Sequence, residues 1–426
     1  MPKDTPRAGK QPWQHILREI FQTPPSHKEY LADNVGGGLR IRPSLRITRD
    51  SRRMLGIQRL KPRAATNFVH TTPCPARTET LRAARSAQST TWEVLNSDAR
   101  GSKNADAGMG LAVGLSFGHA RVMRDADLEF WTRQSSISDP GKVADLLLAL
   151  PADADALTEI SSQLVFHYRA DGDWEANGIE SSRADEINLC YAANMFERLL
   201  ELDPSLGAVR PPGKRILGCC RDFSTLYVSM LRQHRIACRC RVGFASYFDP
   251  GWWIDHVIVE VCDCDRWRMI DPELRPGFNA FDGGPLDRLD LQTDRFMTAS
   301  QAWVEAREGR LDPARVVVAP QLDIPETRGW PQLAHNLVHD IAALNRVELL
   351  LWQDWGASLI RDVLAPEVTL VLDQAATATS RSSVPATVVQ EWANHELFRV
   401  PGSVRQVDPV SIEFSQVDVG RALTEI

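Results

Sequence analysis

Residues 221–270 contain one helical pattern followed by three strand patterns, and this order restricts the fold more than any other feature of the chain. From Arg221 to His234 the apolar residues recur at helical spacing and would line one face. Three later stretches have the composition and alternation of strands, namely 237–247, 254–262 and 267–270. The turn signal Asp249-Pro250-Gly251 separates the first two. A helix followed by antiparallel strands predicts an α+β fold.

Helical patterns also flank this segment on both sides. Before it, apolar spacing predicts helices at 140–150, 156–166 and 183–202. After it, helices are expected at 298–308 and 333–352, while the tail at 365–426 has no pattern that we can assign. We therefore expect a folded domain at about residues 138–360, with N-terminal helices packed on an antiparallel sheet.

Cys220 lies where a loop ends and the predicted helix begins. The first N–H groups of a helix have no partner within it, and the helix dipole is positive at that end. Both favour the thiolate, which is the nucleophilic form of cysteine. The same N–H groups could stabilise an oxyanion on an acyl substrate.

His256 and Asp271 could complete a catalytic set with Cys220. His256 lies within the strand pattern IDHVIVEV, where its ring shares a face with Ile258. Asp271 follows the third strand and precedes Pro272, which would end the ladder. A thiol on one ring nitrogen and a carboxylate on the other would satisfy the imidazole, as in acyl-transfer enzymes. Taken singly, each residue also has a structural interpretation: a structural cysteine, a satisfied core histidine, and a turn or cap aspartate.

The context of these three residues resembles the transglutaminase-like core of the papain superfamily. Gly218–Arg239 has the family's pattern of a cysteine at a helix start followed by a strand, and IDHVIVEV and WRMIDPEL resemble its His-bearing and Asp-Pro strands. The resemblance covers roughly residues 138–360 and extends to a group of bacterial transglutaminase-like proteins. It implies a papain-like fold, with Cys220 as nucleophile, His256 as base and Asp271 as the orienting carboxylate.

Two positions depart from that pattern. Cys219 stands where relatives commonly carry Asn or Asp, and it could be a small apolar residue or a redox partner of Cys220. Arg235 replaces the glycine that is usual at the end of the helix. Neither change removes the predicted triad, and the context Cys-Arg-Asp-Phe favours Cys220 over Cys219 as nucleophile.

Two Cys-X-Cys pairs raise the alternative of a zinc site. If the first two strands pair across their turn, Cys238 and Cys240 would approach Cys262 and Cys264. The spacing is atypical for zinc, however, and all four lie at ordinary strand positions. We therefore predict no metal site, and the lack of a phosphate-binding loop or nucleotide motif predicts no organic cofactor.

Residues 1–125 differ in character from the rest of the chain. The first 100 residues hold 18 Lys and Arg against 8 Asp and Glu, a net charge of +10, which leaves −16 for the remainder of a chain with a net charge of −6. Three interpretations stay open: a disordered basic arm, an arm for nucleic acid or another anionic surface, and a segment that is not translated, since Met109 and Met123 lie in frame. The diffuse charge and scarce aromatic residues disfavour nucleic acid.

The sequence predicts neither secretion nor membrane insertion. No run approaches the roughly 20 apolar residues that span a bilayer, and the first thirty residues contain no apolar core of a signal peptide. We expect a cytoplasmic location, where the eight cysteines would be reduced thiols.

Taken together, these features predict a thiol-dependent enzyme that transfers or hydrolyses an acyl group from an amide of a protein or peptide. Water and an amine remain alternative acceptors. A catalytically silent binding or scaffold protein on the same fold is the competing hypothesis, because fold does not prove function. The sequence does not indicate an oligomeric state.

Removing residues 1–125 should leave the rest of the chain folded, because that segment has no sustained apolar period and a high positive charge. Thermal denaturation of the shortened protein, beside the full chain, would test this. A loss of cooperative unfolding would show that the segment contributes to the core.

Overall fold

The computed structural model describes residues 125–263, 266–360 and 363–424. The basic segment predicted at 1–125 therefore lies outside the described residues, apart from its last position. No helix in the described part of the chain is long and apolar enough to cross a membrane.

A five-stranded sheet forms the centre of the fold, with the order β5-β4-β3-β6 and with β7 parallel to β4. Its strands are β3 (Cys238–Ala245), β4 (Trp253–Asp263), β5 (Arg266–Ile270), β6 (Phe296–Thr298) and β7 (Val316–Val317). The antiparallel pairing of β3, β4 and β5 confirms the three strands predicted from sequence and the turn between the first two. The register places His256 opposite Gly243.

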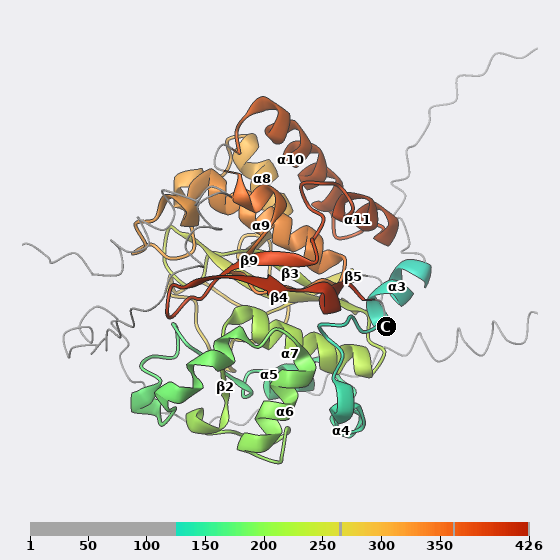
Figure 1. The fold of residues 1–426 in the computed structure, drawn as a ribbon, viewed down its shortest axis with the longest axis vertical. Coiled ribbons are helices and arrows are strands. Elements are labelled where there is room, and N and C mark those ends of the chain that lie inside the picture. Colours follow the sequence, from blue (N-terminus) through green and yellow to red (C-terminus); the bar gives the residue numbers. More distant parts are fainter. Residues whose placement is uncertain (1–124, 264–265, 361–362, 425–426) are drawn as a thin grey trace, which may run out of the picture. The chain divides into compact units, whose positions relative to one another are not determined.

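Helix α7 (Cys220–Gln233) packs on one face of this sheet, as the order of patterns predicted. Phe223, Leu226 and Met230 share an apolar cluster with Val257 and Val259 of β4. The neighbouring helices on this side are α4 (Ala144–Leu148), α5 (Ala154–Ser161) and α6 (Ala192–Leu202). Figure 1 shows strands β3 to β5 between this helical group and the group formed by α8, α9 and α10.

One predicted helix ends earlier than expected, and another begins later. The predicted helix at 156–166 ends at Ser161, and its last residues form strand β1 (Val165–His167), which pairs in parallel with β2 (Ile216–Gly218). The predicted helix at 183–202 is a 3₁₀ segment followed by α6. The chain is extended between them, where the carbonyl of Cys190 accepts a hydrogen bond of 2.6 Å from the buried Arg221.

Helices α8 (Ala299–Arg307) and α9 (Gly329–Leu344) follow the sheet. The first matches its prediction closely, but α9 ends eight residues before the predicted limit of 352, where Arg346 adopts the left-handed conformation with φ 63°. Along β3, Asp340 of α9 accepts hydrogen bonds from the Arg241 guanidinium at 3.0 and 2.9 Å and from the Val242 N–H at 3.0 Å. These bonds hold α9 beside the strand.

The tail that could not be assigned from sequence is folded. It contains α10 (Pro366–Thr379), α11 (Ala386–Ala393), β9 (Ser403–Val407) and β10 (Phe414–Asp418), and β9 pairs with β8 (Gln353–Asp354). Leu372 and Phe398 belong to the same apolar cluster as Trp303 of α8 and Ile341 of α9. The tail therefore contributes to a core that it shares with α8 and α9, and the domain limits 138–360 remain a prediction.

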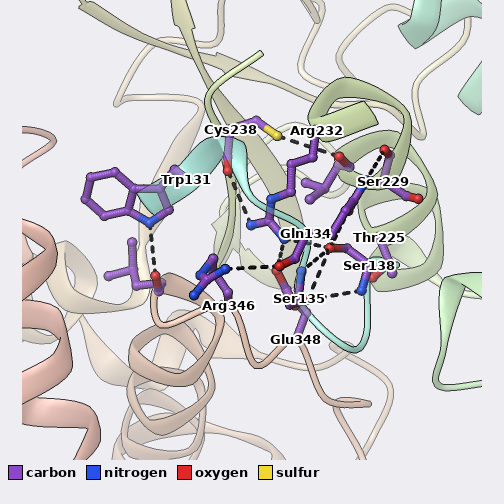
Figure 2. A network of polar contacts seen from close by, with 12 residues as sticks. Trp131, Gln134, Ser135, Ser138, Thr225, Ser229, Arg232, Cys238, Arg346 and Glu348 are labelled. Carbon is purple, nitrogen blue, oxygen red and sulfur yellow. Dashed lines mark hydrogen bonds and ion pairs between the residues drawn. The ribbon is translucent and has the colours of Figure 1, made fainter. Parts of the chain in front are cut away.

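A buried polar network joins α7 to the segments before and after the sheet (Figure 2). The Arg232 guanidinium donates to the Glu348 carboxylate at 3.0 Å, to Ser138 at 2.8 Å and to the Cys238 carbonyl at 3.3 Å. Glu348 also accepts from Ser135 at 2.9 Å. Because both charged side chains are almost fully buried, each depends on the other for compensation.

Glu348→Ala should therefore lower the free energy of unfolding by about 3–5 kcal/mol, because it leaves the Arg232 charge buried without its partner. Urea denaturation followed by circular dichroism would measure this. Glu197→Ala is the matched control, since Glu197 pairs at 3.6 Å with an exposed Lys142 and should barely move the midpoint. Equal effects of the two substitutions would contradict the structural role assigned to Glu348.

Candidate active site

Cys220 is the first residue of α7, as predicted, and strand β2 leads directly to it. Cys219 is the N-cap residue, and its backbone N–H donates to the Asp222 carboxylate at 2.8 Å. Gly218 is required just before this turn, because a Cβ there would lie 2.6 Å from an Asp222 oxygen. The nucleophile candidate is thus placed by a strand on one side and a capped helix on the other.

His256 and Asp271 form the hydrogen-bonded pair that the sequence predicted. His256 Nε2 lies 2.8 Å from Asp271 Oδ2, and both side chains are buried. The same carboxylate accepts from the Tyr247 hydroxyl at 2.5 Å and from the Glu273 N–H at 3.0 Å. These bonds fix the carboxylate, which in turn fixes the imidazole and leaves Nδ1 as the nitrogen that could serve a thiol.

Two aromatic rings complete the surroundings of the imidazole. Phe248 meets His256 edge to face with ring centroids 4.9 Å apart, and Tyr247 does so at 6.1 Å. Burial alone would lower the pKa of His256, but the charge and hydrogen bond of Asp271, with the carboxylates of Glu273 and Asp255, outweigh it and raise the pKa. Asp271 therefore stabilises the imidazolium that would form when His256 accepts a proton from a thiol.

Cys220 lies in a second cluster, with His167 and Glu273. One ligand atom from each of the three residues lies within 4.8 Å of the other two. The charge of His256 influences the pKa of both His167 and Glu273, so this cluster adjoins the His256–Asp271 pair. Glu273 thus lies near both the thiol and the imidazole.

The structure does not bring Cys220 and His256 into hydrogen-bond contact, although both are among the described residues. His256 lies on the Ile258 face of β4, as predicted, whereas α7 packs against the Val257 face. The alternation of side chains along β4 therefore places the His256 ring on the face away from α7 and does not bring it to the Cys220 thiol. Catalytic hydrogen bonds are often long in an enzyme without substrate and tighten when substrate binds.

The ionisation of Cys220 differs from the prediction. A hydrogen bond with Cys219, burial, and the nearby carboxylates of Glu273 and Asp255 raise the pKa of Cys220 well above its usual value. The position at the helix start predicted the opposite, a thiolate near neutral pH. The helix dipole favours the thiolate, but burial and the neighbouring carboxylates favour the neutral thiol and outweigh it.

Three residues of the site were not foreseen from sequence: His167, Tyr247 and Glu273. His167 is placed by the parallel pairing of β1 with β2, where it lies opposite Gly218. The chain separates these partners by about fifty residues, and no local pattern signals their pairing. Only Glu273, two residues after Asp271, lies close enough in sequence to a predicted site residue to have been suspected.

The pairing register does not support the zinc alternative. Cys238 lies opposite Val261, so that Cys262, the next residue along β4, points to the other face of the sheet. Cys238 and Cys240 belong to the apolar cluster against α7. Cys264, the fourth thiol of that hypothesis, lies outside the described residues.

The comparisons with known proteins agree with the fold. Residues 204–272 match the model of the transglutaminase-like superfamily, a segment that contains Cys220, His256 and Asp271. This segment is thus similar to the transglutaminase-like core, and the α+β arrangement of the described residues is consistent with a papain-like fold. The family match covers the centre of the chain and does not specify a reaction.

Known structures and curated sequences add little to this. A candidate cysteine protease from Cytophaga hutchinsonii is 17% identical, with a TM-score of 0.24, and the match covers 35% of this chain and 43% of that protein. Less than half of that protein's length is therefore spanned. No curated protein sequence matches the chain.

Alkylation can identify the reactive thiol. Cys220→Ala should abolish labelling by iodoacetamide at this site, while Cys219→Ala should keep it and move its pH dependence to lower pH. The reason is that Cys219→Ala removes the hydrogen bond that raises the pKa of Cys220. Mass spectrometry of the labelled peptide at several pH values would measure both effects.

If Cys219→Ala is the variant that loses labelling, the nucleophile has been assigned one residue too late. His256→Ala should slow labelling of Cys220 without removing the site. If His256→Ala leaves the rate of Cys220 alkylation unchanged, the imidazole does not activate the Cys220 thiol.

Proposed function

We propose that the protein is a thiol-dependent enzyme that transfers or hydrolyses the acyl group of an amide in a protein or peptide. Cys220 would attack the carbonyl carbon, with His256 as base and Asp271 as its orienting carboxylate. The observation that supports this most strongly is the buried His256–Asp271 hydrogen bond of 2.8 Å, beside a cysteine at a helix start.

The proton would move from the Cys220 thiol to His256 Nδ1 as sulfur bonds to the carbonyl carbon. The imidazolium, stabilised by Asp271, would then protonate the departing amine as the C–N bond breaks. This leaves an acyl-thioester on Cys220. Attack by water would give an acid and attack by an amine a new amide. In both cases His256 would take the proton of the attacking group and return it to sulfur as the C–S bond breaks.

The burial of the Cys220 thiol favours its protonated form before a substrate binds. Because the pKa of Cys220 is raised and its sulfur has no hydrogen bond to His256, the proposal requires substrate binding to bring Sγ and Nδ1 together. Proton transfer would then accompany attack rather than precede it. A cytoplasmic location belongs to the same proposal, because adjacent thiols such as Cys219 and Cys220 persist in a reducing compartment.

The same observations favour a second candidate, a catalytically silent binding protein. A thiol that is buried, protonated and not bonded to a base is what a structural cysteine looks like. The two candidates differ in one respect: only the enzyme forms a covalent acyl intermediate at Cys220.

Trapping of that intermediate tests the proposal. The full-length protein would be incubated with glutamine-containing and other peptide amides, with and without a biotinylated amine, and analysed by intact-protein and peptide mass spectrometry. We expect an acyl adduct on Cys220 that is absent in Cys220→Ala. His256→Ala should reduce its rate of formation by about 10²–10⁴-fold, the usual contribution of a general base.

Asp271→Asn keeps the shape of the orienting residue and should also reduce the rate strongly, because it favours the wrong imidazole tautomer. Glu197→Ala, on an exposed helix surface, serves as the control and should behave as wild type. An alkylation-competent protein that forms no acyl adduct with any amide would support the binding protein instead.

A further inference from the structure

His167 is the side chain that approaches the candidate nucleophile from the strand pair. It ends β1 and lies opposite Gly218 of β2, two residues before Cys220. One of its ring nitrogens lies within 4.8 Å of both the Cys220 sulfur and a Glu273 carboxylate oxygen. The proposed mechanism assigns it no role.

The tautomer of His167 is set by the backbone that follows it. Its Nδ1 accepts hydrogen bonds from the N–H groups of Arg169 at 3.2 Å and Ala170 at 3.1 Å. Backbone N–H groups can only donate, so Nδ1 must offer a lone pair. A neutral imidazole with a lone pair on Nδ1 carries its proton on Nε2, which makes Nε2–H a hydrogen-bond donor.

The orientation of the ring is fixed as well. The His167 N–H donates to the Asp171 carboxylate at 2.9 Å, and the Asp171 N–H donates to the His167 carbonyl at 3.0 Å. The ring also stacks on Tyr168, with centroids 5.7 Å apart and planes 4° from parallel. A donor held this firmly costs little further ordering when a substrate arrives.

Burial, together with the charges of His256 and Arg169, lowers the pKa of His167 to about 3. The ring is therefore neutral across the physiological range and cannot serve as a base there. A neutral imidazole whose pKa is lowered can act as a donor to a carbonyl oxygen that gains negative charge.

We propose that His167 is a catalytic residue, whose Nε2–H donates a hydrogen bond to the oxyanion that forms when Cys220 attacks the substrate carbonyl. This rests on the proposed function and deepens it. Because Nδ1 is occupied by the Arg169 and Ala170 N–H groups, Nε2 is the nitrogen left to serve the site, and a ring nitrogen of His167 lies within 4.8 Å of Sγ. The oxygen of the tetrahedral intermediate lies one bond from the carbon that sulfur has joined, which brings it within reach of this side chain. Such donors act at about 2.7–3.1 Å from the oxyanion.

The protonation of Glu273 is compatible with an oxyanion close to it. Burial raises its pKa to about 8, against the opposing effect of His256, so the site favours the uncharged acid. Its Oε2 atom is buried without a hydrogen-bond partner. An uncharged Glu273 neither repels a developing oxyanion nor binds the His167 donor as strongly as a carboxylate would.

The same three residues could instead be considered as metal ligands, since histidine, cysteine and glutamate all bind zinc. The hydrogen bonds of His167 oppose this. A metal needs a ring-nitrogen lone pair directed at it, but Nδ1 is occupied by two N–H donors and Nε2 carries the proton. The geometry therefore favours a hydrogen-bond donor.

The test compares two reactions of the same thiol. Iodoacetamide alkylates Cys220 by displacement at a saturated carbon, with no oxyanion, whereas p-nitrophenyl acetate acylates it through a tetrahedral oxyanion. His167→Ala in the full-length protein should reduce the acylation rate by about 10²–10³-fold, the loss typical of one oxyanion donor. The alkylation rate at the same pH should stay within about two-fold.

Two further variants separate the hydrogen bond from the shape of the side chain. His167→Gln keeps an N–H donor, while His167→Met has a similar length and no donor, so acylation should be faster in His167→Gln. This pair keeps the proposal testable if His167→Ala fails to fold. Tyr168→Phe, which keeps the neighbouring ring, should acylate at the wild-type rate.

Several results would overturn the proposal. Acylation and alkylation falling in parallel would mean that His167 acts on the thiol and not on the oxyanion. Equal rates for His167→Gln and His167→Met would exclude a donor role. Zn²⁺ protection of Cys220 that is lost in His167→Ala would identify a metal ligand, and an alkylatable wild-type protein that is never acylated would refute the proposed function itself.

Discussion

The burial of helix α7 is the constraint on which the rest of the structure depends. Every residue of the helix except Gln233 is buried, so the polar ones must find partners inside the protein. Arg232 finds Glu348 and Ser138, and Arg221 finds the Glu348 and Cys190 carbonyls. These partners come from segments on both sides of the helix in sequence. Their convergence fixes the position of the helix and, with it, the position of Cys220.

The same burial decides the ionisation of the thiol. A helix N-terminus stabilises a nearby negative charge by about 0.3–1 kcal/mol, less than one pKa unit, which corresponds to about 1.4 kcal/mol. Removal from water can shift the pKa of a buried group by about 3–5 units in the opposite direction. In this site burial acts together with Cys219 and two carboxylates, so the pKa of Cys220 is raised. A resting thiolate would require a positive charge close to sulfur, and His167, which lies within 4.8 Å of it, is neutral because its pKa is lowered.

Features that depend on local interactions could be predicted from the sequence, whereas features that depend on contacts between distant segments could not. The strands around His256, the helix start at Cys220 and the Asp271 partner follow from alternation, spacing and order, and the structure has all three. Strand β1 was predicted as helix because its pairing with β2 is not encoded nearby, and His167 was missed for the same reason. Arg235 occupies the position where the family resemblance indicated a glycine. Its φ of 57° is left-handed, so the backbone has the conformation that a glycine would adopt there although the residue differs.

The charges around the candidate site limit how a proton and a negative charge could move within it. The low pKa of His167 makes it neutral, so His256, paired with Asp271, is the histidine of this site that can accept a proton. Moving a proton from sulfur to His256 would create an ion pair without adding net charge to a buried site, which limits the desolvation cost. When the thiolate charge passes to a carbonyl oxygen, it needs a donor at a new place. The Nε2–H of His167 and the first N–H groups of α7 are fixed before substrate arrives, so neither would need to reorganise as that charge develops.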